Sequence, residues 1–373
     1  MAGKEGGEVK KIRFVIIGSG WRSLFYVRAA KALPDLFEIC AMYCRSSEKA
    51  AEIHDKYNIP VTTSEEECIS ADPDFVVVAV SKSAGPETAI RWMNRGFTVL
   101  CETPAALDLE TLDHLWTLRE QGRKLVIAEQ YILYPRYSSL LKLVKSGIIG
   151  QVHSLNISLA HEYHGASIIR ALLGISVDTA FRVSAKSFAF PVTETRNRYE
   201  VIKDGRIAER KRTVSTFEFD NGSAAYYDFD SEQYHSPIRN NSYKLCGIRG
   251  EILDGTVSYL DAENNPLESC LKIEDVNVER NIELPDLNIE KEVSGIYFGN
   301  KCLYEPVFDL CGLTEDETAV AQMMKLTAEY AAGLADSPYP LKEALQDAYM
   351  AILMKKSETS GETVCSDIRA WMH

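Results

Sequence analysis

The sequence lacks long apolar runs, clustered cysteines and a surplus of positive charge. No apolar run approaches the roughly 20 residues that span a bilayer, and residues 1–11 lack the apolar centre of a signal peptide. The nine cysteines are scattered and form no Cys-x-x-Cys pair, which is typical of reduced thiols rather than of a disulfide framework. We therefore expect a cytoplasmic protein with no membrane partner.

The charge balance disfavours large polyanions as partners. Lys and Arg total 41 while Asp and Glu total 54, so the net charge is -13 at pH 7. Such a surplus repels phosphate backbones, and we expect no nucleic-acid partner. Hydrophobic residues make up 46% of the chain and charged residues 25%, which is the composition of a globular protein. The length of 373 residues indicates about two domains. An enzyme or a sensor of a small molecule fits these features.

Short apolar runs alternate with helical patterns in the first third of the chain. Apolar runs of this kind indicate strands that are buried on both faces, and their alternation with helices predicts a parallel α/β sheet. The expected strands are 12–17, 37–43, 75–80, 97–101 and 124–128. The expected helices are 23–33, 47–57, 86–95 and 109–121, with Ser46 or Ser47 as the N-cap of the second.

The pattern changes near residue 130, which we take as the domain boundary, with domains 1–130 and 131–373. A helix over 137–145, a strand over 152–159 and a short helix near 167–173 are followed by a mostly β stretch, 183–260. In that stretch, Asp204-Gly205 and Asn221-Gly222 lie between alternating runs and predict hairpin turns. Residues 261–292 are polar with weak structural patterns, and two late helices are expected over 314–333 and 341–360.

A glycine-containing loop follows the first expected strand and opens the first expected helix. It reads Gly18-Ser19-Gly20-Trp21-Arg22-Ser23, the first two glycines of G-x-G-x-x-G with Ser in the third place. The first glycine permits the tight turn, the second lets a pyrophosphate approach the backbone, and the helix N-terminus supplies N–H donors. The strand–turn–helix context predicts a dinucleotide site. The alternative is a turn that merely contains two glycines.

The end of the second expected strand indicates which dinucleotide binds. An NAD site usually has a carboxylate there for the ribose hydroxyls, yet residues 39–47 contain none and the strand ends in Cys44-Arg45-Ser46. Arg45 can pair with a 2′-phosphate and Ser46 can donate to it, so NADP is expected in preference to NAD. Arg22 and Arg45 would then form one local positive pocket. The alternative is that Arg45 is simply a solvated surface residue.

Several motifs resemble the Gfo/Idh/MocA oxidoreductase family. Residues 99–105 resemble its strand ending in Glu-Lys-Pro, here Glu102-Thr103-Pro104, and residues 140–152, 244–252 and 341–364 resemble later family segments. The resemblance implies a Rossmann doubly wound domain followed by an α+β domain with a large, open, mostly antiparallel sheet. It also implies hydride transfer between a nicotinamide and a sugar, polyol or related carbonyl in the cleft between the domains.

The family's catalytic set is the tripeptide Lys together with an Asp and a His four residues later. When the chain is aligned through residues 168–174, His164 falls on the His, Ala160 on the Asp and Thr103 on the Lys. Thr103 cannot act as a base near neutrality, whereas His164 can. In one account His164 is therefore the general acid/base and Thr103 positions the substrate. In the other, catalysis is lost and the protein is a dinucleotide-binding sensor or regulatory protein.

The remaining candidates come from strand ends and from the segments around His164. The expected catalytic residues are His164, Thr103 and Glu102. The expected cofactor-binding residues are Gly18, Ser19, Gly20, Trp21, Arg22, Arg45, Ser46, Val80, Ser81, Glu102 and Gln130. The expected substrate-binding residues are Tyr134, Arg136, His161, Tyr163, His164 and Arg170.

Alternatives remain for several of these residues. Arg170 could instead pair with a structural acid, and Lys82 could replace the missing lysine from a neighbouring loop. His153, His161 and His164 match no compact metal signature, so no metal is expected. The open sheet is expected to offer a broad apolar face through which a homodimer or homotetramer assembles.

Overall fold

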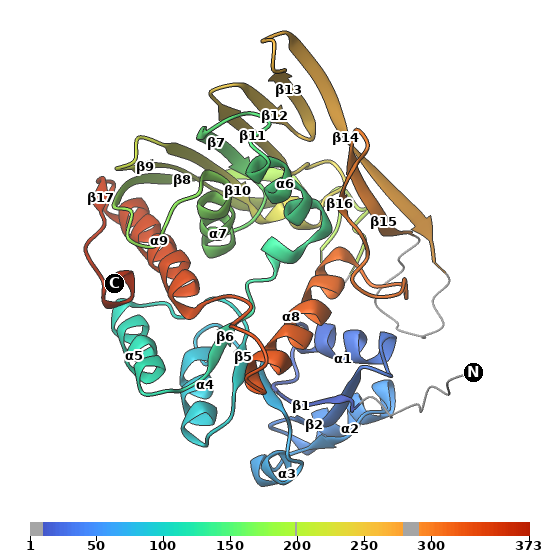
Figure 1. Cartoon of the computed structure of the whole chain (residues 1–373). Coiled ribbons are helices and arrows are strands. Elements are labelled where there is room, and N and C mark those ends of the chain that lie inside the picture. Colours follow the sequence, from blue (N-terminus) through green and yellow to red (C-terminus); the bar gives the residue numbers. More distant parts are fainter. Residues whose placement is uncertain (1–9, 198–199, 279–290) are drawn as a thin grey trace.

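The computed structural model describes residues 10–197, 200–278 and 291–373 and contains two sheets (Figure 1). The first sheet has six parallel strands in the order β3-β2-β1-β4-β5-β6, which is the order of a Rossmann domain. Its strands are β1 Ile12–Ile17, β2 Phe37–Tyr43, β3 Val61–Thr62, β4 Phe75–Val78, β5 Val99–Cys101 and β6 Leu125–Ile127. Its helices are α1 Ser23–Ala32, α2 Ser47–Tyr57, α3 Glu65–Ser70, α4 Gly85–Asn94 and α5 Leu109–Glu120.

The second sheet has eleven strands in the order β16-β15-β14-β13-β12-β11-β7-β10-β9-β8-β17. Only β7 and β10 pair in parallel, and the other neighbouring pairs in the described residues are antiparallel. The strands are β7 Val152–Ser158, β8 Phe181–Thr193, β9 Ile207–Phe219, β10 Ala224–Asp230, β11 Ser242–Gly247, β12 Gly250–Leu253, β13 Thr256–Leu260, β14 Pro266–Asn277, β15 Lys291–Phe298, β16 Lys301–Tyr304 and β17 Val364–Cys365. The predicted fold class, a Rossmann domain plus an open, mostly antiparallel sheet, is confirmed.

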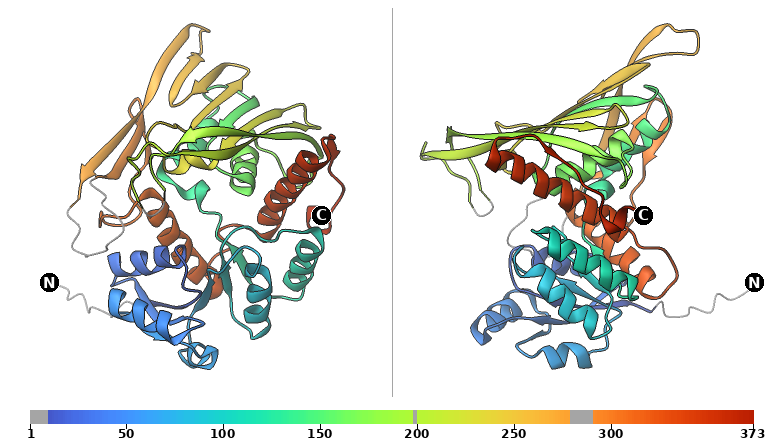
Figure 2. Two further views of the ribbon diagram at one scale, coloured as in Figure 1. Left: turned by 180° about the vertical axis from the view of Figure 1, so that it is seen from behind. Right: turned by 90° about the vertical axis from the view of Figure 1, so that its left-hand side faces the viewer.

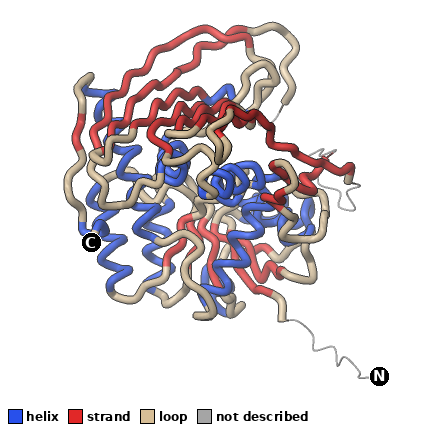
Figure 3. The backbone as a smooth tube through the Cα atoms, turned by 45° about the horizontal axis from the view of Figure 1, so that its top comes forward, coloured by secondary structure: helices blue, strands red, loops and turns tan. Residues whose placement is uncertain are grey.

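Helices cover the side of the large sheet that faces the Rossmann domain (Figure 2). They are α6 Pro135–Lys145, α7 Glu162–Leu173 and α9 Leu341–Ser360. The described residues also include three short 3-10 helices, at 131–133, 231–234 and 370–372. Figure 3 shows the two sheets as separate layers of strands with helices between them. Residues that follow the Rossmann strands thereby come into contact with α7, where Thr103 Oγ1 lies 3.5 Å from His164 Nε2.

Helix α8, Glu315–Ala331, returns from the second half of the chain to pack on α1. The buried pair Arg28–Glu317 joins the two helices, and the Lys124 ammonium donates to the carbonyls of Tyr330 and Ala331 at 3.1 and 3.0 Å. Helix α8 thus packs on the first domain although it follows the large sheet in the chain, and the division at residue 130 stays a prediction. Of the helices in the described residues, none is long and apolar enough to cross a membrane.

Two expectations need correction. Helix α7 begins at Glu162 rather than near residue 167, which places His164 inside its first turn. The polar segment 261–292 contains the 12-residue strand β14. A hollow of about 710 Å³ lies on the outward face of the large sheet and is lined by polar and apolar side chains such as Asn156, Lys186 and Val214, so the expected apolar face stays a prediction.

Candidate active site

The glycine loop is held tightly against the end of β4. Gly18 has φ 120°, and a Cβ there would lie 2.3 Å from the carbonyl oxygen of Ala79, so only glycine fits. The buried Ser23 hydroxyl donates to the same carbonyl at 3.1 Å, so this serine performs the packing expected of the third glycine. A Cβ on Gly20 would meet no atom within 4 Å. The loop therefore leaves an open approach to its backbone at Gly20.

A cavity of about 780 Å³ lies at the carboxyl ends of β1, β2 and β4. Its size suits a nucleotide, and the cradle of loop and helix N-terminus suits a diphosphate. Eight of the expected cofactor-binding residues line it: Gly18, Ser19, Gly20, Trp21, Arg22, Arg45, Val80 and Ser81. The other three lie elsewhere: Ser46 caps α2 by accepting from the Lys49 N–H at 3.2 Å, Gln130 donates to Asp316 at 3.2 Å, and Glu102 contacts α1.

Arg22 adds less positive charge to this cavity than the sequence indicates. Its guanidinium donates to Glu102 and to Asp316, each at 2.8 Å, and two carboxylates neutralise its charge. Tyr26 also donates to Glu102, at 2.6 Å. Glu102 is therefore tied to α1 and fixes the strand end, while Arg45 is exposed at the cavity wall and remains the candidate for a 2′-phosphate.

A buried carboxylate–imidazole pair lies next to the position of the family lysine. His164 Nδ1 lies 2.6 Å from Glu129 Oε2, and the two residues are only 5% and 2% exposed. On the other side of the ring, His164 Nε2 lies 3.5 Å from Thr103 Oγ1. Two predicted catalytic residues, His164 and Thr103, are thus brought together. Glu129 was missed by sequence reasoning, although it lies two residues after the end of β6, where parallel strands place ligand-binding residues.

Burial controls the protonation of this pair. Desolvation raises the pKa of Glu129 to about 8, and hydrogen bonds from Ser167 and the Tyr131 backbone partly oppose the rise. Desolvation also lowers the pKa of His164 well below its usual value, and the charge of Arg22 adds to the effect. His164 is therefore neutral near neutral pH. Because the two groups are in contact, their titration belongs to the pair as a unit.

A second cluster of polar rings surrounds the open side of Thr103. His161 Nε2 lies 2.8 Å from the Tyr163 hydroxyl, and His161 Nδ1 contacts the Tyr234 hydroxyl. The Lys82 ammonium, from the loop after β4, lies 3.5 Å from His161 Nε2 and 5.1 Å from the centre of the Tyr163 ring. Burial raises the pKa of Tyr163 well above its usual value, so this phenol is a neutral hydrogen-bonding group.

The other expected substrate residues have different surroundings. Tyr134 stacks on Tyr131 with ring centres 4.7 Å apart, and Tyr131 lies 4.4 Å from the His164 ring, so the tyrosines form an aromatic wall beside the pair. Arg136 is exposed and donates to Glu315 at 2.6 Å.

Arg170 lies on the same helix as His164 but faces α9. Its guanidinium is buried and forms ion pairs with Asp347, at 2.7 Å, and with Glu343. This geometry favours the structural interpretation over substrate binding. Within the described residues, no group of three or more His, Cys, Asp or Glu side chains is arranged to hold a metal ion.

Comparison with known proteins connects this geometry to a family. Residues 12–130 match the model of the oxidoreductase family with an NAD-binding Rossmann fold, and the resemblance to Gfo/Idh/MocA proteins is thereby confirmed. A scyllo-inositol 2-dehydrogenase (NADP(+)), IolU, of Bacillus subtilis (strain 168) is 27% identical over 291 residues, which cover 74% of this chain and 83% of the relative.

Solved structures share the fold over nearly the whole chain. An oxidoreductase from Agrobacterium radiobacter in complex with NAD+, L-tartaric acid and magnesium has a TM-score of 0.67 at 14% identity, covering 95% of this chain and 98% of the other. A biliverdin reductase from Synechocystis sp. PCC 6803, in complex with biliverdin and NADP+, has a TM-score of 0.61 at 15% identity, covering 93% and 99%. At such identities the likeness shows the two-domain fold alone.

Proposed function

We propose that this chain, whose Rossmann domain belongs to the Gfo/Idh/MocA oxidoreductase family, is an NADP-preferring dehydrogenase of a sugar, polyol or related carbonyl compound. The observation that carries the proposal is the buried pair of His164 and Glu129 beside Thr103, because it provides an acid/base where the family lysine is missing. The similarity to a scyllo-inositol 2-dehydrogenase supports a polyol as substrate.

The glycine loop and the cavity beside it are the proposed dinucleotide site. The loop backbone at Gly20 and the N-terminus of α1 would hold the diphosphate, and Arg45 would hold the 2′-phosphate. When bound, the nicotinamide accepts or returns a hydride at the reacting carbon of the substrate. The protein must then bind the substrate oxygen and move its proton.

The pair performs this proton transfer by switching the tautomer of His164. When Glu129 is ionised, it accepts from His164 Nδ1–H, and the Nε2 lone pair points toward Thr103 and the substrate hydroxyl. As a carbinol is oxidised, Nε2 takes the hydroxyl proton and Nδ1 passes its own proton to Glu129. In the reverse direction Glu129–H donates to Nδ1, and Nε2–H protonates the new alcohol. Thr103 orients the substrate oxygen throughout.

Turnover of defined substrates tests the proposal. The chain is incubated with NADP+ and scyllo-inositol, or with other polyols and sugars, and the reduced cofactor is followed by its absorbance. We expect turnover that His164→Ala lowers by about 10²–10⁴-fold. The matched control is His153→Ala, since His153 is exposed on β7. Loss of turnover in the control as well, or unchanged turnover in His164→Ala, contradicts the assigned role.

A dinucleotide-binding sensor is the second candidate, and the replacement of the family lysine by Thr103 favours it. This candidate predicts tight NADP+ binding, with no turnover of any compound in the panel and none gained in Thr103→Lys. Turnover by the wild-type chain excludes it.

The assembly and the location of the protein are also proposals. We infer a homodimer or homotetramer formed through the open face of the large sheet. Its support is that Val214 and Tyr226 are 37% and 49% exposed on this face, which no described element covers. Light scattering at micromolar concentration tests it, and a monomeric mass contradicts it. The cytoplasm remains the predicted location.

A further inference from the structure

Lys82 extends from the Rossmann domain into the polar cluster of the second domain. It lies in the loop that follows β4, where parallel strands place ligand-binding residues. Its ammonium nevertheless lies 3.5 Å from Nε2 of His161, which is 79 residues further along the chain, and 5.1 Å from the ring centre of Tyr163. Lys82 therefore connects the loop after β4 to His161, the residue that precedes helix α7.

Hydrogen bonds connect this ammonium to the proposed acid/base. His161 Nε2 contacts the Tyr163 hydroxyl at 2.8 Å, and Tyr163 is in turn hydrogen-bonded to Thr103. Thr103 Oγ1 lies 3.5 Å from His164 Nε2. Thr103, the residue in the place of the family lysine, is thus in contact with His164 and is linked to Lys82 through Tyr163 and His161.

The chemistry of the reaction requires positive charge at this point. As a carbinol loses its proton, negative charge builds up on its oxygen, and a positioned cation stabilises that charge more strongly in a partly buried site than in water. Thr103 is neutral. Arg22 is nearby, but its charge is neutralised by Glu102 and Asp316. The ammonium of Lys82 is the cation whose contacts lead to Thr103.

We propose that Lys82 replaces the missing family lysine as the cation that binds the reacting oxygen of the substrate. The inference rests on the proposed dehydrogenase function. During oxidation the O–H bond breaks and its proton passes to His164 Nε2, while the C–H bond breaks and its electron pair leaves with the hydrogen to the nicotinamide. The C=O bond forms, and Lys82 remains protonated throughout, so it acts by charge and not as the base.

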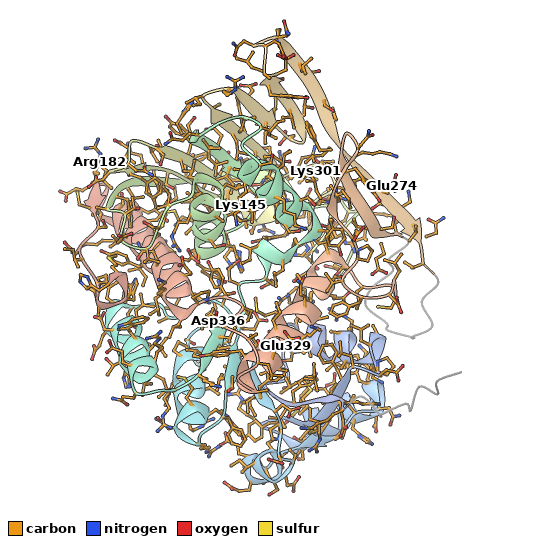
Figure 4. The ribbon with its side chains drawn as sticks, in the orientation of Figure 1. Lys145, Arg182, Glu274, Lys301, Glu329 and Asp336 are labelled. Carbon is orange, nitrogen blue, oxygen red and sulfur yellow. The ribbon has the colours of Figure 1, made fainter. Side chains whose placement is uncertain are left out.

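This role is tested by comparing a substitution that removes the charge of Lys82 with one that keeps it. The kcat of each variant is measured with NADP+ and scyllo-inositol, or with the polyol of the panel that the wild-type chain oxidises best. We expect Lys82→Met to lower kcat by about 10²–10³-fold and to leave the dissociation constant of NADP+ unchanged. Lys82→Arg, which keeps the charge, should recover at least about tenfold of that loss, since tenfold corresponds to only 1.4 kcal/mol. The control is Lys301→Met, because Lys301 is exposed on β16, away from the Rossmann domain (Figure 4).

Restoring the family lysine provides a second measurement. The double variant Lys82→Met, Thr103→Lys returns an ammonium to the tripeptide, and its kcat should exceed that of Lys82→Met. The inference is overturned if Lys82→Met keeps kcat within about threefold, which is under 1 kcal/mol, or if Lys82→Met and Lys82→Arg lose kcat equally. An inert wild-type chain instead overturns the proposed function and this inference with it, so the two failures are distinguishable.

Discussion

Replacing Glu129 by Gln removes the proton store of the proposed acid/base with almost no change in side-chain volume. An ionised Glu129 accepts the proton on His164 Nδ1 across 2.6 Å and thereby keeps the lone pair on Nε2 facing Thr103. The amide of Gln can donate to Nδ1, which moves the imidazole proton to Nε2, or it can accept from Nδ1–H without ever taking the proton. In the first case Nε2 has no lone pair to accept the hydroxyl proton, and in the second the proton taken by Nε2 leaves a buried imidazolium that cannot pass its Nδ1 proton on.

The magnitude follows from the burial of the carboxylate. Its pKa is raised from the ordinary 4.5 to about 8, which corresponds to roughly 5 kcal/mol of penalty on the ionised form. We therefore expect kcat/KM of the wild-type chain for polyol oxidation to rise with pH, with a midpoint near 8, and kcat/KM for carbonyl reduction to fall through the same range. Glu129→Gln should lower the plateau for oxidation by about 10²–10⁴-fold and remove this midpoint.

Stability provides an assay that needs no substrate. Because the folded pKa of Glu129 lies above its unfolded value, its contribution to stability is fully present below about pH 4 and is lost as the pH rises to about 8. Relative to Glu129→Gln, the wild-type chain should therefore lose up to about 5 kcal/mol of unfolding free energy across this window. Urea unfolding at a series of pH values measures the difference. A variant that follows the wild-type pH dependence in both stability and kcat/KM refutes the reasoning.

Three further substitutions test other parts of the site. Gly18→Ala places a Cβ 2.3 Å from the Ala79 carbonyl, so calorimetry should show NADP+ affinity lowered at least about tenfold, or 1.4 kcal/mol; unchanged affinity contradicts the tight turn. Arg45→Asp should shift the ratio of NADP+ to NAD+ affinity about 10–100-fold toward NAD+, because a charged hydrogen bond contributes about 1.5–3 kcal/mol; an unchanged ratio means that Arg45 is only a solvated surface residue. Arg170→Met leaves the buried carboxylate of Asp347 with the Tyr339 hydroxyl but without its cation, so chemical unfolding should show a loss of about 3–5 kcal/mol; a raised KM at unchanged stability would instead support a role of Arg170 in substrate binding.

Apolar runs and capping residues in the sequence were sufficient to predict the strands and helices that depend on neighbouring residues alone. The apolar run of β2, Phe37–Tyr43, and the capped helix α2, Ser47–Tyr57, have the predicted bounds, and Ser46 accepts from the Lys49 N–H as an N-cap should. Strand β14 was not predicted because its side chains are mostly exposed on both faces and so carry no apolar alternation. Helix α7 begins early because the Tyr227 hydroxyl, from a distant strand, accepts from the N–H of Glu162.

The contacts of the candidate site depend on long-range folding and could be predicted only in part. The alignment of residues 168–174 singled out His164 and the family tripeptide singled out Thr103, and the structure brings these two side chains within 3.5 Å of each other. No spacing in the sequence shows that Glu129 contacts a histidine 35 residues away, or that Lys82 reaches His161 from the other domain. These pairs arise only when α7 packs across the ends of the Rossmann strands.

Isotope transfer tests the central claim, that this chain moves a hydride at a carbinol carbon while the pair of His164 and Glu129 moves the proton. NADPH that carries deuterium at the nicotinamide C4 is incubated with the ketone of a panel polyol, and the alcohol product is weighed by mass spectrometry. We predict one deuterium bound to carbon in the product of the wild-type chain, and almost no product from His164→Ala. Tight NADPH binding without deuterium transfer to any panel ketone would contradict the account.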